Sequence, residues 1–67
     1  MIIVKEVKLI ESDMTADVTL FADTKAEVTD NIKISIPDGY KIAPGSTVMT
    51  AIGELAFRKS DDTWSWA

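Results

Sequence analysis

The sequence predicts an all-β domain: a small antiparallel β-sandwich or open barrel of five to seven short strands, with room for one helical turn near residues 24–30. Apolar and polar residues alternate in several short segments, which is the periodicity of a half-buried strand. The first of these segments is rich in β-branched residues, which favour extended backbone. Pro-Gly and acidic turn signals separate the segments. These three observations predict short strands joined by tight turns.

The chain has 67 residues and forms one predicted domain, residues 1–67. A chain of this size buries only about 60% of the surface that its unfolded form exposes, so its stability is marginal. It has no cysteine and no histidine, which excludes disulfides and removes the usual ligands of structural zinc. Small scaffolds without such staples are commonly stabilised by association. We therefore expect a homo-oligomer or docking to a larger assembly, with an efficiently packed monomer as the alternative.

The N-terminal third of the chain predicts a hairpin of two strands. In residues 2–10, apolar and polar residues alternate from Glu6 onward, as in a strand with one buried face. The continuous apolar run at residues 2–4 breaks this alternation and indicates burial on both faces or a bulge. Residues 16–22 alternate again after the polar turn Glu11–Asp13. Two strands so close in sequence favour an antiparallel pair.

The segment after this hairpin is ambiguous. Thr24 and Glu27 have the spacing of a capping box, which predicts one helical turn over residues 25–29. A polar excursion between strands is equally consistent with residues 23–31, because only two apolar residues would anchor a helix there. Both interpretations stay open from the sequence.

The clearest alternation in the chain is the isoleucine series at positions 32, 34 and 36, with Lys33 and Ser35 between its members. This period of two predicts a strand with one apolar face and one solvated face. Pro37–Gly39 then ends the strand, because proline presets a turn and glycine adopts positive φ at little steric cost.

The C-terminal half predicts further short strands. A second Pro-Gly turn, Ala43–Ser46, separates a short extended piece from the next strand. The four-residue loop Ser60–Thr63 predicts a closing hairpin. The extended segments predicted in this half are residues 40–42, 47–52, 55–59 and 64–66.

Both tryptophans lie in the last predicted strand, two positions apart and therefore on one face of it. If Trp64 and Trp66 pair back across the loop, we expect them to lie near Leu55 and Phe57. Aromatic cross-strand contacts there would contribute about 0.2–1 kcal/mol each. The C-terminal segment is therefore predicted to be an ordered strand.

The charge of the chain excludes several classes of partner. Seven Lys and Arg against eleven Asp and Glu give a net charge of −4 at pH 7, and the basic residues are scattered along the chain. Such a surface repels phosphate, so we expect no direct binding of nucleic acid. An acidic protein that imitates DNA and blocks a DNA-binding enzyme is an alternative. The first apolar run is too short for a signal peptide or a membrane span, so we expect no membrane association.

No catalytic, cofactor or metal motif is recognisable. A nucleophilic triad needs a base of near-neutral pKa, and the chain has neither histidine nor cysteine. Asp61 and Asp62 are neighbours in a turn and lack the spacing of a glycosidase pair or an EF-hand loop. Pro44–Thr47 lacks the lysine and the following helix of a phosphate-binding loop. We therefore expect no enzymatic activity, no cofactor and no metal site.

The aromatic residues are the candidate binding residues. Tyr40, Trp64 and Trp66 would form a platform for sugar rings if they shared an exposed face. Together with Phe57 they are alternatively the anchors of a protein interface, since Trp and Tyr are enriched at interface hot spots. The third interpretation is that so small a domain uses its tryptophans as core.

Two stretches of the chain resemble small structural proteins of tailed bacteriophages. The first is LFADTKAEVTD, and the second is IPDGYKIAPGSTVMTAIGELAFRKSDDTWSWA. In that family an acidic AD-T-K-x-E segment follows an apolar strand and precedes a PGS turn, a T-A pair and a K-S-D-x-T-W end. These elements correspond here to Ala22–Glu27, Pro44–Ser46, Thr50–Ala51 and Lys59–Trp64.

The resemblance implies a component of the virion or of its assembly, such as a head fibre, a capsid decoration protein or a head-associated accessory protein. Such a protein is made in the cytoplasm of the bacterial host and becomes part of the virion. The leading hypothesis is therefore a non-enzymatic structural protein that acts by self-association or by docking to a capsid or particle surface. The alternatives are a module that binds glycans of the host cell surface and the acidic DNA mimic.

Overall fold

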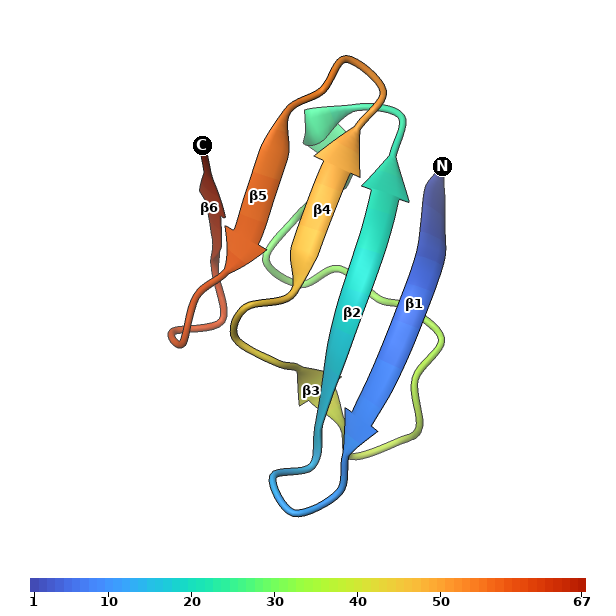
Figure 1. Ribbon diagram of the computed structural model, residues 1–67, viewed down its shortest axis with the longest axis vertical. Coiled ribbons are helices and arrows are strands. Elements are labelled where there is room, and N and C mark those ends of the chain that lie inside the picture. Colours follow the sequence, from blue (N-terminus) through green and yellow to red (C-terminus); the bar gives the residue numbers. More distant parts are fainter.

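The computed structural model describes all residues, 1–67, and contains six strands and one short 3₁₀ helix (Figure 1). The predicted all-β class, the number of strands and the helical turn near residues 24–30 are confirmed. No helix has the length and the apolar character that crossing a membrane requires. The elements are β1 (Ile2–Ile10), β2 (Thr15–Ala22), η1 (Lys25–Glu27), β3 (Lys41–Ile42), β4 (Thr47–Thr50), β5 (Leu55–Arg58) and β6 (Trp64–Trp66).

All strands belong to one open sheet in the order β1-β2-β4-β5-β6, and β3 pairs with the first residues of β2. Neighbours in this order are antiparallel except at β2, to which both β3 and β4 run parallel. The sheet is therefore mixed and not antiparallel throughout. The reason is the connection after β2, residues 23–40, which we call the crossover. It returns the chain to the starting end of β2, and strands entered from that end run parallel to β2.

β1 and β2 form the predicted antiparallel hairpin. Their register shifts between Val4 and Glu6, which places a bulge next to the continuous apolar run, as the sequence indicates. In this register Val4 lies opposite Leu20 on the buried face, while Ile3 lies opposite Phe21 on the other face. The run supplies both faces by ordinary alternation, and the bulge after it shifts the phase, so that Val7, opposite Val18, lies on the same face as Val4.

The crossover begins with η1, which is the one helical turn of the chain. The Thr24 N–H donates a hydrogen bond to Glu27 Oε2 at 3.0 Å, as the predicted capping box requires. Val28, directly after η1, is buried in the core. A single buried residue anchors one turn against the core, whereas a longer helix would need further apolar residues at helical spacing.

The strand predicted at residues 32–36 is wrong. Its three isoleucines are half-buried against the core and the residues between them are exposed, so the alternation itself is present. From residue 29 to residue 40, however, the backbone makes only local backbone-to-backbone hydrogen bonds, such as Ile32 N–H to the Thr29 carbonyl at 3.1 Å. A period of two requires only an extended chain with one side on an apolar surface. Here that surface is the face of the sheet and not a neighbouring strand.

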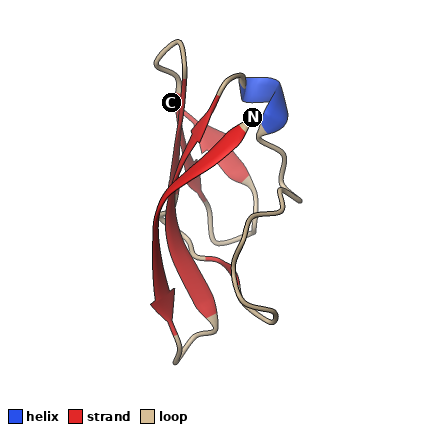
Figure 2. Cartoon of the chain, turned by 90° about the vertical axis from the view of Figure 1, so that its right-hand side faces the viewer, coloured by secondary structure: helices blue, strands red, loops and turns tan.

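The core lies between one face of the sheet and the crossover, and Figure 2 shows η1 and the crossover on one side of the sheet only. β2 supplies the centre of this core, since its four inward side chains are each no more than 1% exposed. The crossover isoleucines cover the centre from the other side. The buried apolar residues are Ala16, Val18, Leu20, Ala22, Val28, Ile42, Val48, Ala56 and Trp64.

Ser46 connects three strands at the point where β2 changes neighbours. β2 pairs with β3 at Ala16 and with β4 from Thr19 onward, and the Val18 N–H faces the gap between the two ladders. The buried Ser46 hydroxyl accepts this N–H at 3.0 Å and donates to the Ala16 carbonyl at 3.5 Å. The Ser46 carbonyl accepts the Arg58 N–H of β5 at 2.8 Å. One serine therefore closes the gap and joins it to the second half of the sheet.

β5 and β6 form the predicted closing hairpin in a register that differs from the prediction. Arg58 pairs with Trp64 and Ala56 pairs with Trp66, so the five residues Lys59–Thr63 separate the paired ends. One loop residue more than predicted reverses which face of β5 the tryptophans share, because side chains alternate along a strand. The prediction that Trp64 and Trp66 lie near Leu55 and Phe57 is therefore wrong. The opposite face of β5 carries Leu55 and Phe57.

We expect Ser46→Ala to lower the free energy of unfolding by about 1–3 kcal/mol, because the buried Val18 N–H loses its acceptor. Urea denaturation of the two proteins measures this difference. Ser35→Ala is the matched control, since Ser35 is exposed on the crossover. Equal losses in the two variants would contradict the role of Ser46.

We expect the stability contribution of Asp61 to depend on pH. Thr63 donates its N–H at 3.2 Å and its hydroxyl at 2.5 Å to Asp61 Oδ1, and the hydroxyl bond above all lowers the pKa of Asp61. A carboxyl pKa that is lower in the folded state stabilises the fold above the unfolded pKa of about 3.9, and this stabilisation is lost as pH falls through the folded pKa.

Asp61→Asn is therefore expected to melt at a lower temperature than the wild type at pH 7, with the difference in melting temperature narrowing at acidic pH, below the unfolded pKa of about 3.9. Thermal melts at the two pH values check this, and an NMR titration of the Asp61 carboxyl measures its pKa directly. A gap of constant size at both pH values would contradict the ionic origin of the effect.

Candidate functional site

The face of the sheet that the crossover leaves uncovered carries apolar side chains. In Figure 1 the crossover passes behind the sheet, so this surface, which we call the open face, is toward the viewer. Four of its side chains are between 39% and 48% exposed, and the fifth, Phe21, is half-buried. The open face consists of Ile3, Phe21, Met49, Leu55 and Phe57.

The strand register places four of these side chains in one row. Ile3 lies opposite Phe21, Phe21 opposite Met49, and Met49 opposite Leu55, so the row crosses β1, β2, β4 and β5. Phe57 lies in the adjacent row. Large contiguous apolar patches on a protein surface mark interaction sites more often than scattered apolar residues do. The open face is therefore the first candidate site.

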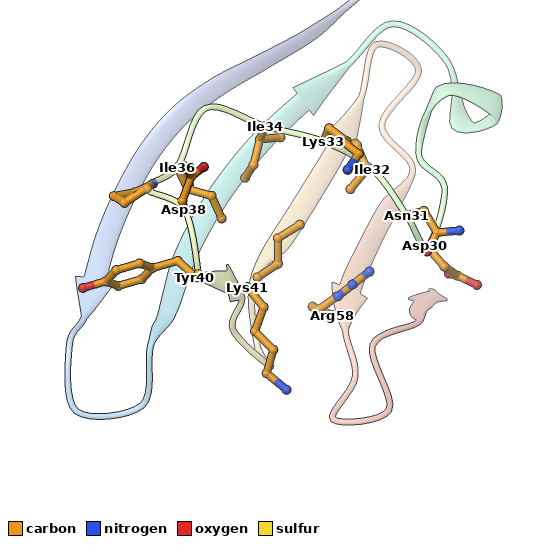
Figure 3. A pocket seen from close by; sticks show the side chains of 13 residues that line it. Asp30, Asn31, Ile32, Lys33, Ile34, Ile36, Asp38, Tyr40, Lys41 and Arg58 are labelled. Atoms are coloured by element: carbon orange, nitrogen blue, oxygen red, sulfur yellow. The ribbon is translucent and has the colours of Figure 1, made fainter.

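The second candidate is a cavity of about 500 Å³ between the crossover and the covered face of the sheet, which we call the crossover cavity. Figure 3 shows its lining side chains. Most of the lining comes from the crossover itself, with Lys41 and Ile42 from β3 and Arg58 from β5. Its apolar walls are formed by Ile32, Ile34, Ile36 and Ile42.

Arg58 is the polar group for which the fold supplies the fewest partners. Its side chain lies on the covered face and the residue is only 8% exposed. The buried Nε and Nη1 atoms have no hydrogen-bond acceptor, and the guanidinium carbon lies 5.1 Å from the centre of the Trp64 ring. A guanidinium remains charged in proteins, and a buried charge without a counter-charge is strongly destabilising. Such a group in a cavity wall marks a candidate functional site.

Trp64 holds the crossover at Thr29 and Asp30, beside this cavity. Its indole N–H donates to the Thr29 carbonyl at 2.9 Å, and its backbone N–H donates to Asp30 Oδ1 at 3.2 Å. The ring itself is buried in the core. Trp64 is therefore a structural residue that positions the cover of the cavity.

The four aromatic candidates from the sequence are not brought together. Trp64 is buried, and Trp66 is half-buried against the core with Lys25 Nζ at 4.9 Å from its ring centre. Phe57 lies on the open face, on the opposite side of the sheet. Tyr40 is half-buried in the cavity lining, and in Figure 3 its ring points away from the guanidinium. The flat platform of Tyr40, Trp64 and Trp66 is therefore not assembled, and the core interpretation describes Trp64.

Sequence reasoning missed Arg58 as a candidate. The alternation of residues 55–59 assigns Leu55 and Phe57 to the apolar face, which leaves Arg58 on the solvated one. The signal that identifies it is the loop length, because a five-residue loop places Trp64 opposite Arg58. A charged residue paired with a buried tryptophan is itself held on the buried face.

The metal-ligating side chains form no further candidate site. No three His, Cys, Asp or Glu side chains are arranged to hold a metal ion. No protein-family model, curated protein or solved structure matches the chain. The open face and the crossover cavity are therefore assigned on their geometry.

We expect Arg58→Met to raise the free energy of unfolding by about 1–3 kcal/mol, because an apolar side chain of similar length replaces a buried unpaired charge. The lost cation–π contact with Trp64 offsets about 0.5–2 kcal/mol of the gain. Urea denaturation measures the difference. Lys33→Met, at an exposed position of the same cavity rim, is the control and should change stability by less than about 0.5 kcal/mol. A large loss of stability in Arg58→Met would contradict the interpretation of Arg58 as a buried, unpaired charge that destabilises the fold.

Proposed function

We propose that this protein is a non-enzymatic structural or accessory protein that acts by self-association through the open face. The observation that carries the proposal is the cross-strand row of exposed apolar side chains on the uncovered side of a single sheet. A sheet with one apolar face is stable when a second layer covers that face. The crossover provides this layer on one side, and a second copy would provide it on the other.

The dimensions of the sheet set the size of a possible dimer interface. Figure 1 is viewed down the shortest axis of the molecule and shows the sheet face-on, and the two longer dimensions of the whole molecule are 35 and 21 Å. A standard interface requires about 800 Å² from each partner. That area is close to a fifth of the 4326 Å² of accessible surface of the chain. A dimer interface of standard size would therefore cover most of this side of the sheet, including the polar residues around the open face.

The pattern of the face also favours a second copy. In a twofold dimer the same patch of both subunits meets, so the row from Ile3 to Leu55 would pack against its own copy. Two sheets that pack face to face lie about 10 Å apart with interdigitated side chains. The product would be a β-sandwich of two chains, and each chain would gain burial that its own core cannot supply.

The setting that we propose for this assembly is the bacteriophage virion. The resemblance of the segments around Ala22–Glu27 and Lys59–Trp64 to structural proteins of tailed phages supports it. A head fibre, a decoration protein or a head-associated accessory protein acts through repeated contacts with copies or with a capsid surface. A small single-sheet domain with one apolar face is suited to such contacts.

We expect Leu55→Glu to shift the protein from dimer to monomer, because a carboxylate in an apolar interface is buried without a partner. Size-exclusion chromatography with light scattering across a concentration series measures this shift. Leu9→Glu is the matched control, since Leu9 is also a strand leucine, 42% exposed against 39% for Leu55, on the other face of the sheet. This control should stay dimeric.

A wild-type protein that remains a monomer at the highest concentration would contradict self-association. Dissociation of both variants would show that the open face is not the interface. Co-purification with phage particles tests the virion setting separately, and its absence would remove that part of the proposal.

A further inference from the structure

We propose that the crossover cavity binds a small carboxylate with an aliphatic body, whose carboxylate pairs with Arg58 and whose body packs on the isoleucines. This site lies on the covered face of the sheet, opposite the open face. It is therefore independent of the proposed self-association.

The charge of Arg58 is the first argument. Nε and Nη1 are buried and unpaired, and they belong to different donor edges of the guanidinium. Each edge matches the two oxygens of a carboxylate, which makes this pair one of the stronger polar contacts in proteins. In Figure 3 the guanidinium points toward the part of the crossover that carries residues 30–33. A bound carboxylate would supply the acceptors that the fold does not.

The other charges of the cavity lining support an anion. Lys33 and Lys41 add two cations to that of Arg58, against the carboxylates of Asp30 and Asp38, in a chain whose net charge is −4. Asp30 already accepts the backbone N–H of Trp64. The Lys41 amino group lies 3.7 Å from the Asp62 carboxylate, outside the cavity lining. With Lys41 paired to Asp62, Lys33 and Arg58 balance Asp30 and Asp38, so the lining lacks the excess of negative charge that the whole chain has.

The apolar walls decide the class of anion. Four isoleucines line the cavity, three from the crossover and Ile42 from β3. A phosphate dianion requires several charged or backbone donors around it, and Arg58 is the one buried cation here. A monoanion with a hydrocarbon body fits one guanidinium and apolar walls. The volume of about 500 Å³ is within the range of about 300–1,000 Å³ typical of small-molecule sites.

The crossover gives such a ligand a way in. Between residues 29 and 40 its backbone-to-backbone hydrogen bonds are local. The attachment of these residues to the sheet consists of isoleucine packing and the two bonds from Trp64, whereas residues 23–28 are held by further contacts, among them the buried Val28. Segments held by few contacts open at low free-energy cost while the rest of the fold stays intact. The cover of the cavity can therefore separate from the sheet without disturbing the strand ladders.

The test uses octanoate as the probe and the full chain as the protein. Titration followed by ¹H–¹⁵N NMR is expected to give saturable shifts at Ile32, Ile34, Ile42 and the Arg58 side chain. Octanol, which lacks the charge, and acetate, which lacks the body, are each expected to bind at least about tenfold more weakly. Arg58→Met should lose at least about tenfold in octanoate affinity, and Lys8→Met, which removes a charge at an exposed position outside the cavity lining, should retain it.

Three results of this experiment would contradict the proposal. Shifts centred on Phe57 and Met49 would show unspecific binding to the open face and would overturn the proposal. Equal affinity of the wild type and Arg58→Met, in a folded variant, would overturn it as well. Inorganic phosphate that binds as tightly as octanoate would refute the assigned class of ligand. A rise in melting temperature with octanoate in the wild type and not in Arg58→Met would support the site independently of NMR.

Discussion

The fold depends on how β2 changes partners, and Ser46 makes that change possible. A strand that pairs with one neighbour and then with another leaves a gap in its ladder, where a buried N–H without an acceptor is costly. The Ser46 hydroxyl fills this gap at Val18, and its backbone reaches β5 at Arg58. Without this hydroxyl the Val18 N–H would be buried and unpaired between the β3 and β4 ladders. The covered face, the cavity and the open face all follow from the continuity of the sheet at this point.

The sequence predicts elements well and their mutual positions less well. The β1-β2 hairpin, the bulge, the turn at η1 and the closing hairpin all follow from local alternation and turn chemistry. The isoleucines at 32, 34 and 36 show the limit of such reasoning, because alternation reports one buried side and does not say whether a strand or a sheet face buries it. The parallel pairing of β4 with β2 depends on the path of the crossover, which no local pattern encodes.

The candidate sites show the same limit. Phe57 is recognisable from the sequence as an apolar residue in a half-buried strand, whereas its position on the open face depends on the β5-β6 register. A difference of one loop residue exchanges the two faces of β5, so the same hairpin presents either Phe57 or Arg58 to the core. The aromatic residues attract attention by their size, yet Trp64 is part of the core. The residue with the unusual environment is Arg58, which pairs with Trp64 across the hairpin and has buried nitrogen atoms without a hydrogen-bond partner.

The two hydrogen bonds of Trp64 also constrain how the chain folds. They connect residues that are 34 and 35 positions apart in sequence, so closing them costs more chain entropy than any hairpin does. The attachment of the crossover to Trp64 therefore forms only when β6 is in place, whereas the β1-β2 hairpin depends on contacts close in sequence. A fragment that ends before β6 would lose this attachment. Formation of the cavity thus depends on contacts between distant segments, and no local segment of the chain contains it.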